Sequence, residues 1–271
     1  MTLVARLLLA GLLLLAGAYS AGAQTSVEVS PLRVDLKMAP GQATTQAVTL
    51  TNMGKETVRI RATLTDWHLT KDGTPQFEDP SDGRKYAASG WTRIAPPELV
   101  IEPRQQATVR FSLSVPQGAE PAGYRTGVIF DFAPAAANPL AQATKQINVR
   151  NRIATLIYAH VGTPPAAVDM TDLRSRVAPE QTVVFATLKN TSARSVRTKG
   201  TLRLLDVDGK LVREVQVPDV PVLPESERDV AISLSNGGAP PLPAGEYRVE
   251  VRIDVGLAEV IVGETTLKVV K

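Results

Sequence analysis

Short stretches in which apolar and polar residues alternate occupy most of the chain after Ser26. In Val58–Leu64 apolar side chains alternate with Arg and Thr, and Val109–Val115 and Tyr247–Ile253 repeat the pattern. A period of two places one face of a strand on a core and the other in water. No stretch shows a competing helical period, and 20 prolines interrupt the chain at the ends of these stretches. The pattern predicts an all-β protein.

One strand, turn and strand unit occurs twice. An alternating stretch ends in Thr49–Asn52, a polar turn follows, and a second alternating stretch ends at Leu64; the same order returns in Thr187–Leu202. Repeats that keep their order predict two related domains. Two further pairs follow in the same order: Glu102-Pro103 with Leu223-Pro224, and Ala122-Gly123-Tyr124-Arg125 with Ala244-Gly245-Glu246-Tyr247-Arg248.

The spacing of these repeats locates an insertion in the first copy. The members of the first pair are 138 positions apart and those of the second 121, so the first copy has about 17 additional residues. They fall in the segment 66–91. Aromatic residues on a loop suit the binding of protein or carbohydrate, but we prefer the interpretation that the two tryptophans close the ends of a core, because buried tryptophan is common in such sandwiches. The aromatic residues of the segment are Trp67, Phe77, Tyr86 and Trp91.

The number of candidate strands indicates the fold. Seven strands in about 110 residues are typical of an immunoglobulin-like sandwich, and the second half, from Val168 onward, contains seven more. We therefore predict two immunoglobulin-like β-sandwich domains in tandem, residues 24–161 and 167–271, joined by a stiff, proline-containing linker at 162–166. The candidate strands of the first half are Val27–Leu36, Thr44–Thr51, Thr57–Trp67, Trp91–Ile101, Ala107–Val115, Tyr124–Phe132 and Ile147–His160.

The first 23 residues have the features of a secretory signal peptide. Arg6 precedes an apolar run from Leu7 to Ala18, and Ala21-Gly22-Ala23 forms a cleavage site. The run is shorter than the roughly 18 residues that a membrane span needs. We therefore expect cleavage, a mature chain without a membrane span, and a periplasmic or secreted location.

The composition excludes several kinds of chemistry. Cysteine is absent, which removes disulfides, thiolate metal sites and thiol nucleophiles. His68 and His160 are the only histidines, and neither has a second ligand at metal spacing. Without Arg6, 29 basic residues face 27 acidic ones, and no basic stretch is interleaved with aromatic residues, so nucleic acid is not an expected partner. The sequence predicts no enzyme, cofactor or metal site, and leaves protein binding through sheet edges, the interdomain cleft or loops.

Several short motifs resemble the first domain of the periplasmic pilus chaperones of the PapD-like type. The resemblance covers roughly 27–161 and implies that two such domains form a boomerang. It also implies that the last strand of the first domain is lent to an incomplete pilus subunit. The motifs are Ser30–Arg33, Thr49–Asn52, Ala95–Pro97, Ile101–Pro103 and Ala107–Arg110.

The same resemblance implies a pair of basic residues that anchor the terminal carboxylate of the subunit. Arg33 occupies the place of the first. The second place falls near Ala154 or Thr155, where no base stands, and the nearest bases are Arg150 and Arg152. An ordinary solvated strand face is the alternative interpretation for Arg33.

The predicted donor strand also departs from the family. Its members carry a row of bulky apolar residues there, whereas this chain offers only Ile147 and Val149, for which a plain core position is the alternative. The whole mature chain is also similar to Gram-positive surface proteins that associate with WxL-domain partners, which pair a PapD-like with an immunoglobulin-like domain. We expect a chaperone-like protein that binds envelope or pilus-type subunits. The alternative is a surface adhesion or scaffolding protein that binds through the segment 66–91.

Overall fold

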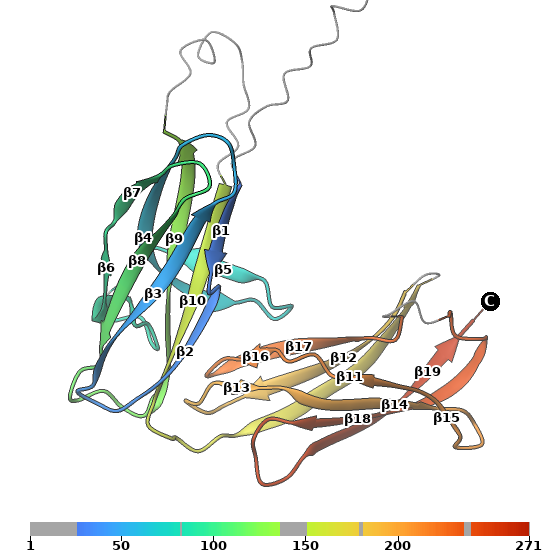
Figure 1. Ribbon diagram of the computed structural model, residues 1–271. Coiled ribbons are helices and arrows are strands. Elements are labelled where there is room, and N and C mark those ends of the chain that lie inside the picture. The colour runs from blue at the N-terminus through green and yellow to red at the C-terminus, as the bar shows by residue number, and fades with distance from the viewer. Residues whose placement is uncertain (1–25, 82, 136–150, 179–180, 236–239, 271) are drawn as a thin grey trace, which may run out of the picture.

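The computed structural model describes residues 26–81, 83–135, 151–178, 181–235 and 240–270, so the predicted signal peptide lies outside the described residues. Two β-sandwiches meet at an angle and give the chain an L shape (Figure 1). The all-β prediction and the two immunoglobulin-like sandwiches are confirmed. Within the described ranges no helix is long and apolar enough to cross a membrane.

The first sandwich packs a four-stranded sheet, in the order β1-β3-β8-β6, against a sheet in the order β2-β10-β9-β4-β5, with β7 paired to β4. Apolar side chains from both sheets, among them Leu50, Phe111 and Phe130, are fully buried between them. A single 3₁₀ turn, Ser89–Trp91, precedes β6. The strands are β1 (Val27–Ser30), β2 (Arg33–Met38), β3 (Ala43–Asn52), β4 (Val58–Leu69), β5 (Pro75–Glu78), β6 (Thr92–Ala95), β7 (Glu98–Ile101), β8 (Gln106–Ser114), β9 (Ala122–Pro134) and β10 (Asn151–Val161).

The second sandwich packs the sheet β11-β12-β17 against the sheet β15-β14-β18-β19, and β13 and β16 form a small separate pair. Its core is a second cluster of buried apolar residues that includes Leu188, Leu202 and Ile232. The strands are β11 (Val168–Ala178), β12 (Gln181–Asn190), β13 (Val196–Arg197), β14 (Lys199–Leu205), β15 (Leu211–Gln216), β16 (Pro221–Val222), β17 (Ser226–Ser233), β18 (Gly245–Asp254) and β19 (Ile261–Val269).

Two strands expected to be continuous are each divided between the two sheets of the first sandwich. The expected strand Val27–Leu36 breaks at Pro31, so that β1 pairs with β3 while β2 pairs with β10. The expected strand Trp91–Ile101 breaks at Pro96-Pro97 into β6 and β7, which pair with β8 and β4. Prolines are typical of strand ends, and at both places the chain leaves one sheet for the other.

The sequence repeat has a counterpart in buried hydrogen bonds. The Nδ2 of Asn52 donates to the carbonyls of Glu56 and Ile101, and its Oδ1 accepts from the next turn. Asn190 does the same in the second sandwich, where Nδ2 donates to the carbonyls of Arg194 and Leu223. Each asparagine therefore holds a turn of its sandwich together in the same way.

A second shared feature is a tyrosine whose hydroxyl donates to a carbonyl four residues earlier. Tyr124 donates to Glu120 at 3.1 Å, and Tyr247 donates to Pro243 at 2.8 Å. This arrangement is the tyrosine corner of immunoglobulin-like sandwiches. The last of the repeated sequence pairs, Ala122–Arg125 with Ala244–Arg248, thus contains the tyrosine of this corner in both domains.

Replacing Asn52 with alanine should lower the stability of the first sandwich. The side chain is fully buried, and its loss leaves the carbonyls of Glu56 and Ile101 without their donor. We expect a decrease of about 2 to 3 kcal/mol in the free energy of unfolding, measured by urea denaturation. Gln46→Ala, at an exposed position of β3, is the control; equal losses in the two variants would contradict the role given to Asn52.

Candidate functional site

The strand β10 has one edge that is only partly covered. β9 pairs with β10 along its whole length, whereas β2 pairs with it only from Leu156 onward, opposite Arg33. The N–H of Leu156 donates to the carbonyl of Leu32, so Leu156 points its backbone groups toward β2. Because strand backbones alternate, the N–H and C=O groups of Arg152 and Ala154 point to the same side. In the described part of the chain no strand pairs with them there.

The break at Pro31 leaves this edge open. If β2 continued upstream in the same register, Pro31 would lie opposite Ala154, and Val29 would lie opposite Arg152. Instead, Val29 pairs with Leu50 in the other sheet. The hydroxyl of Thr155 donates to the carbonyl of Pro31 at 2.9 Å and fixes the chain at the point of departure. An unpaired edge of this kind is a template for another strand.

The face beside the open edge is apolar, and two of its residues are small. Ala154 lies opposite Ile129, Leu156 lies opposite Gly127, and all four share the face of Tyr158 because strand side chains alternate. At the outer end of this face Arg152 forms an ion pair with Asp131. Arg152 is therefore near the open edge, but a carboxylate of the same domain already holds its charge.

Arg33 lies where the open edge ends. Its Nε is 2.6 Å from Asp35 Oδ2, and its guanidinium lies over the ring of Tyr158, 5.4 Å from the centroid. Desolvation works against the charged form, but the hydrogen bond and attraction from Asp35 raise the pKa of Arg33 overall. A partly exposed, permanently charged group therefore marks the end of the edge.

The exposed Leu32, whose residue is 55% accessible, stands immediately beside Arg33. Sequence reasoning missed it because one apolar residue next to a proline gives no periodic signal. Of the residues predicted to bind a partner, Arg33 and Arg152 flank the open edge. Ile147, Val149 and Arg150 lie outside the described residues.

The second sandwich packs on the far end of this face and forms the elbow. Trp67, Tyr158 and Leu223 form a buried cluster in which the Trp67 and Tyr158 rings meet edge to face, with centroids 5.1 Å apart. The N–H of Gly123 donates to the carbonyl of Ala193 at 2.8 Å, and a side chain on Gly123 would overlap Ser195. The domains thus approach each other to backbone contact.

Buried polar groups lie beneath this cluster. Arg125 donates from Nε to the carbonyl of Trp67, while its Nη1 and the Oδ1 of Asp66 are buried without a hydrogen-bond partner among the described residues. Burial lowers the pKa of Arg125, and the nearby Asp66 partly offsets this effect. Asp66 is buried, and the guanidinium of Arg125 lies against the Trp67 ring, 5.9 Å from its centroid.

The segment 66–91 is not the open loop of the alternative prediction. Trp67 is 2% exposed, and its Nε1 donates to the carbonyl of Thr126 at 2.7 Å. Trp91 is half-buried against Tyr124, and the hydroxyl of Tyr86 donates to Glu225 of the second sandwich. Among these four aromatic residues only Phe77, at 42%, is strongly exposed. The arrangement does not favour a recognition loop, because the segment folds back as a hairpin against the second sandwich.

The described residues contain no group of three or more His, Asp and Glu side chains placed to hold a metal ion. His68 pairs with Glu78 on the hairpin, and His160 lies 3.6 Å from Asp35 in the elbow. Among the described strands, the open edge of β10 offers unpaired backbone groups, an apolar face and charged groups at its ends.

Neither a protein-family model nor a curated protein matches this sequence. Many of the solved structures that match are fimbrial chaperones of the PapD-like type, the family that the sequence resembles. The class 5 fimbriae chaperone CfaA is 12% identical, with 88% of this chain and 98% of CfaA covered and a TM-score of 0.48. The Pseudomonas aeruginosa chaperone CupB2 is 13% identical, with 89% and 97% covered and a TM-score of 0.42. The Acinetobacter baumannii complex of CsuC with the tip subunit CsuE gives 16% identity, 76% and 90% coverage and a TM-score of 0.41.

The surroundings of His160 should make the free energy of unfolding depend on pH. Burial lowers the pKa of His160 below 6.5; Asp35 opposes this shift, while Arg33 and Arg194 reinforce it. Below about pH 6.5 the unfolded chain therefore binds a proton that the folded chain does not, and stability falls as the pH decreases. We expect His160→Gln to reduce this loss between about pH 7 and pH 5. Urea unfolding at several pH values gives the free energy of unfolding as a function of pH. The same pH dependence in the variant and the wild type would contradict this role of His160.

Proposed function

We propose that this protein is a periplasmic, chaperone-like protein that pairs a strand of an envelope or pilus-type subunit with the open edge of β10. The observation that carries the proposal is the edge at Arg152 and Ala154, which ends at the guanidinium of Arg33. Main-chain hydrogen bonds along an edge give affinity, and the alternate side chains of the added strand give register. The similarity to structures of fimbrial chaperones is in keeping with this role.

The geometry of β2 also favours one direction for the added strand. β2 runs parallel to β10, and its first residue, Arg33, lies opposite Leu156. A parallel partner strand beside Arg152 and Ala154 would be collinear with β2 and would point its carboxyl end at Arg33. An antiparallel partner would bring its amino end there. A free terminal carboxylate would gain a charge-assisted hydrogen bond from the guanidinium, whereas an ammonium would be repelled.

The face beside the edge supports a partner that supplies the bulky side chains itself. Ala154, Gly127 and Ile129 form an apolar surface beside the open edge. A subunit with an incomplete core has apolar side chains that it must cover, and such a surface suits them. The second basic position expected from the family resemblance is not filled from β10, because Thr155 stands there with its hydroxyl bonded to Pro31.

Two variants test the proposal at different points. Arg33→Ala removes the charge at the end of the edge, and we expect about 2 kcal/mol of lost binding energy, roughly a thirty-fold weaker complex. Ala154→Pro removes an N–H from the open side while β9 still pairs with the other side of the strand, and it should weaken binding as well. Arg59→Ala, at an exposed position of β4, is the control.

The measurement begins with complexes captured from the cell envelope of the source organism with the mature chain, whose bound subunit is identified by mass and purified. Affinity is then compared among the variants, and hydrogen exchange is followed at the Arg152 and Ala154 amides. Protection of these amides by the subunit, together with weaker binding in both variants, supports the proposal. A subunit that binds without protecting them, or with equal affinity in Arg33→Ala and Arg59→Ala, would overturn it.

A further inference from the structure

Part of the additional segment of the first domain contacts one short stretch of the second. Lys71, in the turn at the tip of the β4–β5 hairpin, contacts Glu227 and Asp229 of β17, and the later residues Lys85 and Tyr86 contact Glu225 immediately before β17. In Figure 1 this hairpin projects from the first sandwich toward β16 and β17.

Alternate residues of the second domain supply the acidic side of this contact. Glu225, Glu227 and Asp229 are two residues apart along one stretch of chain, so their side chains share a face where the stretch is extended. Lys85 Nζ lies 2.5 Å from Glu225 Oε1, and Lys71 Nζ lies 3.3 Å from Glu227 Oε2 and 3.9 Å from Asp229 Oδ1. Two lysines of the first domain thus face three carboxylates of the second.

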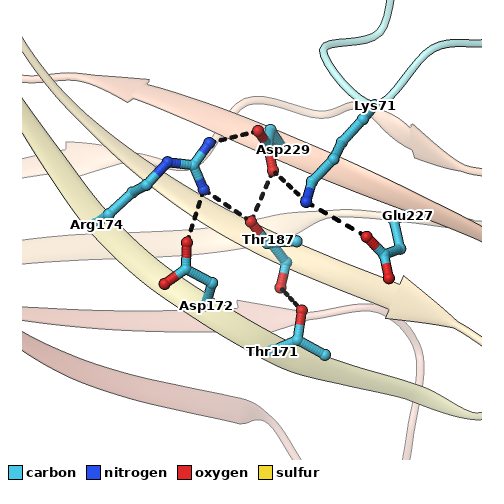
Figure 2. A network of polar contacts seen from close by, with 7 residues as sticks. All are labelled: Lys71, Thr171, Asp172, Arg174, Thr187, Glu227 and Asp229. Atoms are coloured by element: carbon cyan, nitrogen blue, oxygen red, sulfur yellow. Dashed lines mark hydrogen bonds and ion pairs between the residues drawn. The ribbon is translucent and has the colours of Figure 1, made fainter.

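Figure 2 shows that the last of these carboxylates is held from both sides. The hydroxyl of Thr187 donates to Asp229 Oδ1 at 2.6 Å, and Arg174 Nη2 lies 2.5 Å from Oδ2. Burial opposes ionisation of Asp229, but these hydrogen bonds and the nearby cations lower its pKa overall. Asp172 holds the other side of Arg174 at 2.8 Å. Lys71 therefore contacts a fixed charge and not a freely rotating side chain.

Backbone contacts accompany the ion pairs. The N–H of Asp229 donates to the carbonyl of Lys71 at 2.7 Å, so the hairpin tip covers part of the free edge of β17. Gly73, at φ 90°, lies so close to Arg228 that a side chain at this position would overlap the guanidinium. Exposed ion pairs alone are weak, but a main-chain hydrogen bond and a glycine contact fix the same few residues of both domains.

We propose that the hairpin turn 70–74, together with Lys85 and Tyr86, is an interdomain strut that holds the two sandwiches at a fixed angle. The elbow otherwise consists of the small Trp67, Tyr158 and Leu223 cluster and the backbone contact at Gly123. Domains joined by a small interface move relative to one another by default. The strut adds a second point of attachment away from the linker, and two separated points restrict rotation to the line that joins them.

The test measures the distance between one spin label on each domain. The chain has no cysteine, so Gln46→Cys and Val212→Cys, at exposed positions of β3 and β15, give unique labelling sites. In this background Lys71→Glu with Lys85→Glu places five carboxylates in the contact, and we expect the distance distribution to broaden roughly two-fold or more. Lys55→Glu with Lys210→Glu makes the same change in net charge at two exposed lysines away from the strut and should leave the width unchanged.

A pair of glycine variants separates the contact from backbone strain. Gly73 and Gly83 have φ of 90° and 89°, but a side chain at Gly83 would meet nothing within 4 Å. Gly73→Ala should broaden the distribution, and Gly83→Ala should not. Exchanging the charges of one pair, Lys85→Glu with Glu225→Lys, should leave the width close to that of the wild type.

Unchanged widths in both strut variants, or equal broadening in the controls, would overturn the proposal. The measured distance reports the arrangement of the domains only if both are folded. Each variant is therefore first shown by urea unfolding to retain both sandwiches. If the double lysine variant does not fold, the comparison of Gly73→Ala with Gly83→Ala decides alone.

Discussion

The departure of the chain from one sheet to the other at Pro31 is the constraint on which the proposed site depends. At Pro31 the chain leaves the ladder with β10, and the preceding strand finds its partner in β3. The first part of β10 keeps β9 on one side and, among the described strands, has no neighbour on the other. The same break places Arg33 at the beginning of β2, and the open edge therefore ends at a positive charge.

Much of this arrangement can be predicted from the sequence, because alternation and repeated motifs can be recognised within short stretches of the chain. Alternation identified the strands, and the repeated motifs at Asn52 and Tyr124 identified equivalent turns and corners in both domains. The two divided strands were not predicted, because their halves alternate in the same way whichever sheet they join. The prolines at 31 and 96–97 mark these breaks, but a proline alone does not tell whether a strand ends or changes sheets.

The elbow was the least predictable part, because its contacts join residues that are far apart in sequence. The length difference between the copies revealed the additional segment, and its aromatic content was compatible with either a recognition loop or buried tryptophans. In the fold, Trp67 is buried because the second sandwich covers it with Leu223. A sequence signal for the strut does exist in the alternating Glu225, Glu227 and Asp229, yet one sequence does not reveal that Lys71 and Lys85 are their partners.

The open edge and the elbow are electrostatically connected, since Arg33 belongs to both. Asp219 of the second sandwich contributes to the raised pKa of Arg33, and Arg197 of the same sandwich, held by Asp219 at 2.7 Å, acts on Tyr158 beneath the Arg33 guanidinium. Coulombic interactions between such groups change with separation, so the potential at the end of the edge varies with the angle between the domains. A partner strand that ends at Arg33 would therefore meet a charge whose surroundings are set by both sandwiches, although all its main-chain hydrogen bonds would be made to the first.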